Sequence, residues 1–122
     1  MDKFIIFAIG GVLIVATVFI LNAGGKKDNL VLNQFAQCLS EKGVVMYGAD
    51  WCPHCQNEKK AFGNSFQYVN YVECPKEPQK CLALGVDGYP TWIFSDGKRL
   101  VGEQGLEKLA GESGCALRVI GK

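Results

Sequence analysis

Two cysteines separated by two residues, Cys52 and Cys55, are the side chains of this sequence best suited to chemistry. They lie in the segment WCPHC (residues 51–55), which follows the short apolar run 44–47 after three residues. A buried strand that leads into a helix would place Cys52 at the helix N-terminus, where free backbone N–H groups and the helix dipole favour an anion. Cys55 would lie on the same helix face, close enough to form a disulfide bond. We therefore expect Cys52 to be the exposed attacking thiolate and Cys55 the more sheltered resolving thiol.

The other residues of the motif support this interpretation. Pro53 fits the first helical turn, because its missing N–H is not needed there. Trp51 completes the motif on its N-terminal side. His54 is the chain's one histidine, and an imidazole beside the thiolate would stabilise the reduced form and make the disulfide a stronger oxidant. The alternative for His54 is a solvated surface side chain.

A zinc site is the alternative for the cysteine pair itself, since two cysteines at this spacing can form half of one. The cysteines that follow, Cys74 and Cys81, are too far apart in sequence to form a second half of the same kind. We therefore expect redox chemistry and no bound metal.

A second signal lies downstream, where Gly88-Tyr89-Pro90-Thr91 leads into an apolar strand. Proline cannot donate a hydrogen bond to a sheet, so it belongs at the start or the edge of a strand. A cis bond between Tyr89 and Pro90 is compatible with this position. An ordinary turn proline is the alternative.

The elements that must position these residues follow from periodicity. Apolar residues at helical spacing predict a helix that ends near Gly43, and a further helix follows the motif over 56–66. Strands are expected at 44–47, 68–73, 91–94 and 98–101, with a hairpin turn at 95–97. A short helix over 79–84 and a last amphipathic helix around 106–110 complete the order α-β-α-β-α-β-β-α. Strands separated by helices imply parallel pairing, with an antiparallel closing hairpin. The fold class is α/β.

The N-terminal stretch from Phe4 to Leu21 has no charge and no proline. As a helix it would be about 27 Å long, close to the roughly 30 Å of a bilayer's hydrocarbon core. The nearest cleavage site has a bulky Leu21 three positions before the cut, which favours an uncleaved anchor over a signal peptide. We therefore divide the chain into a transmembrane anchor over 1–22, a polar linker over 23–29 and one domain over 30–122.

Composition limits the compartment and the partners. The net charge is +1 and no basic stripe is present, so nucleic-acid binding is not expected. Six cysteines and an anchor place the domain on the extracytoplasmic side of a membrane, because disulfides persist outside the reducing cytosol. Against this, Lys26 and Lys27 follow the anchor and only Lys3 precedes it, whereas the larger basic group normally stays in the cytoplasm. We give the cysteines more weight.

Together these segments resemble the thioredoxin fold, and in particular the small thioredoxin-like domain that is fused to, or partners, vitamin K epoxide reductase homologues. The segments that carry the resemblance are FAQCLSEKGVVMYGADWCPHCQNEKKAF, YVECP, GVDGYPTWIFSDGKR and LEKLAGESGC. The resemblance implies a central mixed sheet flanked by helices and a redox-active disulfide with no further cofactor. Pro90 would be the cis-proline that faces the disulfide, and Tyr89 would offer backbone groups to an extended substrate peptide. The implied partner is a quinone-linked membrane oxidoreductase of the vitamin K epoxide reductase type, which would re-oxidise Cys52 and Cys55.

The other four cysteines are interpreted as structural. Cys74 and Cys81 bracket a short loop that one disulfide could close, and the resemblance also favours this bridge; two buried free thiols are the alternative. Cys38 on the first helix and Cys115 after the last would then pair by elimination, although nothing local requires it.

One position departs from the thioredoxin pattern. Many proteins of this fold carry a buried acidic residue six positions before the first motif cysteine, where this chain has Met46. The proton acceptor for Cys55 is therefore not defined by the resemblance. Asp50 and Glu58 are nearby, but a solvated charge is the more common state for each.

The sequence thus favours a membrane-anchored dithiol oxidase that introduces disulfides into reduced extracytoplasmic proteins. A disulfide reductase or isomerase is the alternative within the same class. A non-catalytic metal- or peptide-binding module on the same fold is the alternative from another class.

Overall fold

A computed structural model of the protein describes residues 29–118. The expected anchor over 1–22 lies outside the described residues, as does the linker up to residue 28. Asn29, placed in the linker from the sequence, is already helical. Across residues 29–118, no helix combines the length and the apolar composition that crossing a membrane requires.

The centre of the domain is a four-stranded mixed sheet in the order β2-β1-β3-β4. Its strands are β1 (Val45–Gly48), β2 (Asn70–Glu73), β3 (Thr91–Ile93) and β4 (Arg99–Val101). β1 pairs in parallel with β2 and antiparallel with β3, and β3 pairs antiparallel with β4. The hairpin between β3 and β4 turns at the expected place, where Gly97 adopts a φ of +88°.

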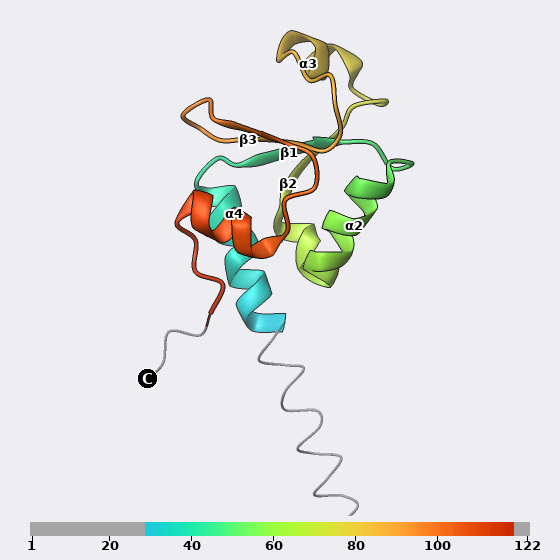
Figure 1. Ribbon diagram of the computed structural model, residues 1–122. Coiled ribbons are helices and arrows are strands. Elements are labelled where there is room, and N and C mark those ends of the chain that lie inside the picture. Colours follow the sequence, from blue (N-terminus) through green and yellow to red (C-terminus); the bar gives the residue numbers. More distant parts are fainter. Residues whose placement is uncertain (1–28, 119–122) are drawn as a thin grey trace, which may run out of the picture. The chain divides into compact units, whose positions relative to one another are not determined.

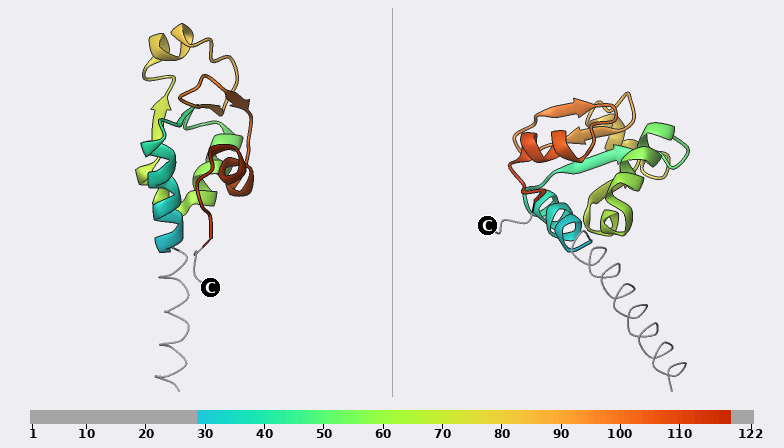
Figure 2. Two further views of the ribbon diagram at one scale, coloured as in Figure 1. Left: turned by 90° about the vertical axis from the view of Figure 1, so that its left-hand side faces the viewer. Right: turned by 60° about the horizontal axis from the view of Figure 1, so that its bottom comes forward.

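Helices cover one face of this sheet (Figures 1 and 2). Residues 29–41 are helical, and α2 (Pro53–Phe62) and α4 (Leu106–Ser113) follow later in the chain. The 3-10 helix η1 (Gly63–Tyr68) continues from α2, and α3 (Pro78–Ala83) lies beyond the sheet, apart from the other helices. A mixed sheet flanked by helices is the architecture expected from the sequence.

The helix after the motif is shorter than expected, because α2 ends at Phe62 and not at Phe66. Gly63 has a φ of +57°, and its N–H bonds to the carbonyl groups of Lys59 and Lys60. Glycine adopts a positive φ at little cost, which makes it a common residue where a helix stops. The following residues then wind more tightly as η1.

The direction of β3 also differs from expectation, since it runs antiparallel to β1 although a helix precedes it. In register, Gly48 at the end of β1 pairs with Glu73 at the end of β2, and Tyr47 pairs with Thr91 at the start of β3. The chain therefore leaves the sheet at the end of β2 and enters it again, at the start of β3, at the same end of the sheet. The six-residue helix α3 lies within this connection, and it does not carry the chain back to the other end of the sheet.

Alternating side chains divide the sheet into two faces. Met46 and Trp92 point to the helix-covered face and pack with Phe35, Phe62 and Leu109 in the main core. The Phe35 and Phe62 rings stack with their centroids 5.8 Å apart. A smaller cluster around Cys74, Cys81 and Val86 contacts residues of the other face, including Tyr47 and Ile93. The α3 segment thus covers part of the second face.

Two disulfide bonds fasten this structure, Cys38–Cys115 and Cys74–Cys81. These are the pairings favoured from the sequence. The first ties the helix over 29–41 to the segment after α4, across 77 positions of sequence. The second closes a loop of only 7 positions at the start of α3. Since a cross-link restricts the unfolded chain more when its loop is longer, the first bond should stabilise the domain more.

Replacing each pair with alanine should show this difference. In a Cys52→Ala/Cys55→Ala background, we expect Cys38→Ala/Cys115→Ala to lower the free energy of unfolding by about 4.5 kcal/mol and Cys74→Ala/Cys81→Ala by about 2.5 kcal/mol. Urea unfolding monitored by tryptophan fluorescence measures both values. Equal losses would show that local packing, and not loop length, sets the contribution of each bond.

Candidate active site

Cys52 lies at the N-cap of α2, immediately before Pro53 at the helix start. The backbone N–H of Cys55 donates to Cys52 Sγ at 3.4 Å, so the sulfur occupies the position of a helix-capping acceptor. Cys52 is 6% exposed and Cys55 is fully buried. Cys52 is thus the more accessible of the two, but it is more covered than the sequence suggested.

The loop before β3 provides this cover. The Tyr89–Pro90 peptide bond is cis, and Pro90 is buried. Cys52 Sγ donates to the carbonyl oxygen of Tyr89 at 3.6 Å. Trp51 stays 68% exposed and meets the Tyr89 ring edge-on, with centroids 6.0 Å apart. The structure therefore brings the motif and the downstream proline loop into one site.

Cys55 lies against Gly48, the last residue of β1. A Cβ added at Gly48 would come within 2.8 Å of Cys55 Sγ, so this close approach requires glycine. Burial raises the pKa of Cys55 to about 12, and a backbone hydrogen bond from Ala49 only partly opposes this effect. Cys55 is therefore a neutral thiol at neutral pH, and it must lose a proton before it can attack a disulfide.

His54 is turned toward the loop before α4. Its Nδ1 lies 2.9 Å from Glu103 Oε2, with 67% of the side chain exposed, and Asn57 donates to the same oxygen at 3.2 Å. The hydrogen bonds from His54 and Asn57 hold the pKa of Glu103 below its usual range. Residues 54 and 102–105 line an open hollow of about 470 Å³ beside the motif. His54 is thus as exposed as expected for a solvated surface side chain, and its ion-pair partner is Glu103.

Glu58 is a buried acid, in contrast to the solvated charge favoured from the sequence. It is 1% exposed; Trp92 Nε1 donates to its Oε2 at 2.6 Å and the N–H of Gly105 donates to its Oε1 at 2.7 Å. The signal was present in the sequence, because Cys55, Glu58 and Phe62 share the inner face of α2. Asp50 does remain exposed and pairs with Lys59 at 3.1 Å.

The cysteines outside the motif are bonded to each other, so in the described part of the chain Cys52 and Cys55 are the free ones. Cys74 and Cys81 are therefore not available as partners in a zinc site. Among residues 29–118, no group of three or more His, Cys, Asp or Glu side chains is arranged to hold a metal ion. The arrangement supports thiol chemistry.

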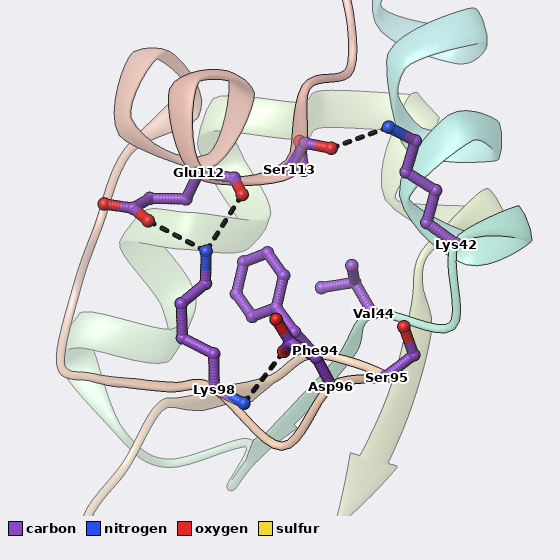
Figure 3. Close-up of a pocket in the computed structure, with 8 residues that line it drawn as sticks. All are labelled: Lys42, Val44, Phe94, Ser95, Asp96, Lys98, Glu112 and Ser113. Atoms are coloured by element: carbon purple, nitrogen blue, oxygen red, sulfur yellow. Dashed lines mark hydrogen bonds and ion pairs between the residues drawn. The ribbon is translucent and has the colours of Figure 1, made fainter.

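A second hollow, of about 160 Å³, lies at the other end of β1, next to Val44 (Figure 3). Its two lysines are already engaged, because Lys42 Nζ donates to the Ser113 carbonyl and Lys98 Nζ donates to the carbonyl and carboxylate oxygens of Glu112. Both ammonium groups thus bind oxygen atoms at the C-terminal end of α4. None of the site residues expected from the sequence lines this hollow.

The difference between the two motif thiols gives a direct prediction. With the protein reduced at about pH 8, iodoacetamide should modify Cys52 alone, because Cys55 is fully buried and its raised pKa keeps it protonated. Mass spectrometry of peptides counts the modified sulfurs, and the same reaction in urea, where both thiols are accessible, is the control. Equal labelling of Cys52 and Cys55 in the folded protein would contradict the assigned roles.

Comparison with known proteins places this site in a family. Residues 26–112 match the family model described as Thioredoxin. Thiol-disulfide oxidoreductase LTO1 of Arabidopsis thaliana is 40% identical over 91 residues, which cover 67% of this chain and 24% of that protein. The chain thus spans about a quarter of the length of this curated relative. The solved structure of Fasciola hepatica thioredoxin matches with 25% identity and a TM-score of 0.46, over 58% of this chain and 76% of that one. With its cysteine pair at the start of α2 and the matched family model, the chain belongs to the thioredoxin family.

Proposed function

We propose that the protein is a dithiol oxidase that introduces disulfide bonds into extracytoplasmic proteins. A substrate thiolate attacks Cys52 Sγ in the Cys52–Cys55 disulfide, the S–S bond breaks, and Cys55 leaves with the electron pair. A second substrate thiolate then attacks the mixed disulfide. The substrate departs with a disulfide bond, and the two cysteines remain reduced.

The observation that carries this proposal is the capping position of Cys52. Its sulfur accepts the N–H of Cys55 at the start of α2, where the helix dipole stabilises a thiolate. A thiolate exists only in the reduced form, so stabilising it makes the disulfide a stronger oxidant. Cys55 stays protonated in the reduced protein, because burial raises its pKa to about 12, so the charge on Cys52 decides the direction of the effect and a measured potential tests it.

The surface around Cys52 supports a broad class of protein substrates. Trp51 is largely exposed, and the backbone at Tyr89 already accepts a hydrogen bond from Cys52 Sγ. An extended peptide that pairs with backbone groups is recognised with little dependence on its sequence. Such a site suits an enzyme that acts on many unfolded, reduced proteins.

Two structural disulfides support an extracytoplasmic location. Cys38–Cys115 and Cys74–Cys81 account for all four cysteines outside the motif, and such bonds are rare in reducing compartments. The apolar segment 4–21 would act as the anchor that holds the domain at the membrane surface.

The partner in this proposal is a quinone-linked membrane oxidoreductase of the vitamin K epoxide reductase type, which accepts the electrons of Cys52 and Cys55. The support is the resemblance of the segments between Leu32 and Cys115 to domains that work with such enzymes. A membrane anchor would raise the effective concentration of the domain at its partner. The matched Arabidopsis thaliana protein is named as a thiol-disulfide oxidoreductase and is about four times longer than the match, which covers 24% of it.

The reduction potential tests the direction of electron flow. Equilibrated with glutathione buffers, the Cys52–Cys55 pair should have a potential well above the roughly −270 mV of thioredoxin and closer to the roughly −120 mV of strong oxidases. Alkylation of free thiols followed by mass spectrometry gives the midpoint, and a Cys52→Ala variant provides the baseline. A midpoint near that of thioredoxin would instead indicate a disulfide reductase.

Trapping tests the partner and the compartment. In the protein's own cells, a Cys55→Ala variant should retain mixed disulfides on Cys52, because Cys55 is no longer available to displace the bound protein. We expect to identify secreted proteins with paired cysteines, together with a quinone-linked membrane protein, and none of them with the control Cys52→Ala/Cys55→Ala. If only cytosolic proteins are trapped, the proposed location is wrong.

A further inference from the structure

A tyrosine hydroxyl lies beside the buried thiol of Cys55. Both groups border the same point above Gly48, since a Cβ added there would lie 2.8 Å from Cys55 Sγ and 3.4 Å from the hydroxyl oxygen of Tyr71. Tyr71 belongs to β2, where it pairs in register with Met46 of β1. The hydroxyl therefore approaches Cys55 from the edge strand of the sheet, on the side of the thiol away from the substrate loop.

A carboxylate continues this line of polar groups. The Tyr71 hydroxyl donates to Glu73 Oε2 at 2.5 Å, and Glu73 Oε1 accepts the backbone N–H of Asp50 at 2.9 Å. Asp50 is exposed and pairs with Lys59, whose Nζ lies 4.1 Å from the centre of the Tyr71 ring. The groups thus lead from a buried sulfur to charged side chains at the surface.

The two other candidate acceptors do not fit. Met46, at the position where many proteins of this fold have a buried acid, is fully buried and has no proton-accepting group of that kind. Glu58 is buried, but both of its oxygens already accept hydrogen bonds, from Trp92 and from Gly105. Glu73 differs because its bond to Tyr71 is made by a hydroxyl, which can accept one proton while it donates another.

We propose that Tyr71 and Glu73 form the proton path of Cys55. When Cys55 resolves a mixed disulfide on Cys52, its proton passes to the Tyr71 oxygen while the Tyr71 hydroxyl proton passes to Glu73. The Cys55 sulfur then attacks Cys52 Sγ, the Cys52–Cys55 disulfide forms, and the bound partner leaves as a thiolate. Glu73 releases its proton to water, and Tyr71 ends unchanged. The reverse sequence protonates Cys55 when the disulfide is opened.

The charges around the path agree with this order of events. Burial is the larger cause, and the hydrogen bond to Glu73 the second cause, of the rise in the pKa of Tyr71 far above its usual value. The hydroxyl therefore transfers a proton without becoming a stable anion. Burial likewise raises the pKa of Cys55, and Lys59 acts in the opposite direction. The titratable and charged groups that face the path come from the motif, from α2, from the end of β2 and from the segments after β1 and β2: Cys52, Lys59, Glu73, Asp50 and Lys76.

The test is the resolution step alone, which does not depend on the proposed oxidase function. A nitrothiobenzoate mixed disulfide is formed on Cys52 of the reduced protein, and the coloured thiol released by Cys55 is followed by stopped flow. Tyr71→Phe removes only the hydroxyl, so we expect release at about pH 7 to slow by about a hundredfold, the lower end of the range for the loss of a general base. The variant rate should then rise with hydroxide over the alkaline range, where the wild-type rate changes less.

Three further variants make the result decisive. Glu73→Gln keeps a hydrogen-bond acceptor for Tyr71 but cannot take a proton, so it should reproduce the slow, hydroxide-dependent release. Tyr68→Phe alters a tyrosine at the surface, 37% exposed, and should behave as wild type. Cys55→Ala should release no thiol. Wild-type rates and pH profiles in both Tyr71→Phe and Glu73→Gln would overturn the proposal. If Tyr71→Phe fails to fold, the Glu73→Gln profile alone decides.

Discussion

The hydrogen bonds of Glu58 connect the three segments from which the active site is built. Glu58 lies on α2 one turn after Cys55, it accepts from Trp92 two residues after Pro90, and it accepts from Gly105 at the start of α4. A buried carboxylate is costly unless its oxygens are satisfied, and a donor left without it in the core would also be costly. Any movement of α2 away from β3 therefore breaks a buried hydrogen bond. This restraint keeps the motif cysteines facing the proline loop.

The closeness of Cys55 to the sheet creates a second requirement. Gly48 allows the sulfur to approach β1, which shields it from reagents and holds it near Cys52. The same burial raises the pKa of the thiol to about 12, so the group that must attack is held in its unreactive form. Shielding and reactivity therefore oppose each other at Cys55. An enzyme with this geometry needs a route for the proton that does not expose the sulfur to water.

Local signals in the sequence were sufficient for the order of the elements and for the helix start at the motif. Pro53, Gly97 and the apolar run before the motif each determine backbone geometry within a few residues, so their effects can be read directly. The direction of β3 could not be read in this way. It depends on the end of the sheet at which the chain lies after the short helix α3. The burial of Glu58 was readable from helical spacing, but a carboxylate on an inner face is unfavourable until its partners are known. Those partners, Trp92 and Gly105, come from distant parts of the chain.

The same limit explains why the polar groups beside Cys55 were not identified from the sequence. Tyr71 and Glu73 alternate on a strand, a pattern that fits an ordinary edge strand equally well. Only the parallel register with β1 places Tyr71 beside Met46 and Glu73 beside Gly48. Glu58 and Glu73, the carboxylates on either side of Cys55, differ in what their donors can do. Glu58 is bonded to an indole and a backbone N–H, which donate but cannot accept, so it fixes positions. Glu73 is bonded to a hydroxyl, which does both, and it alone of the two is placed to exchange a proton with a thiol.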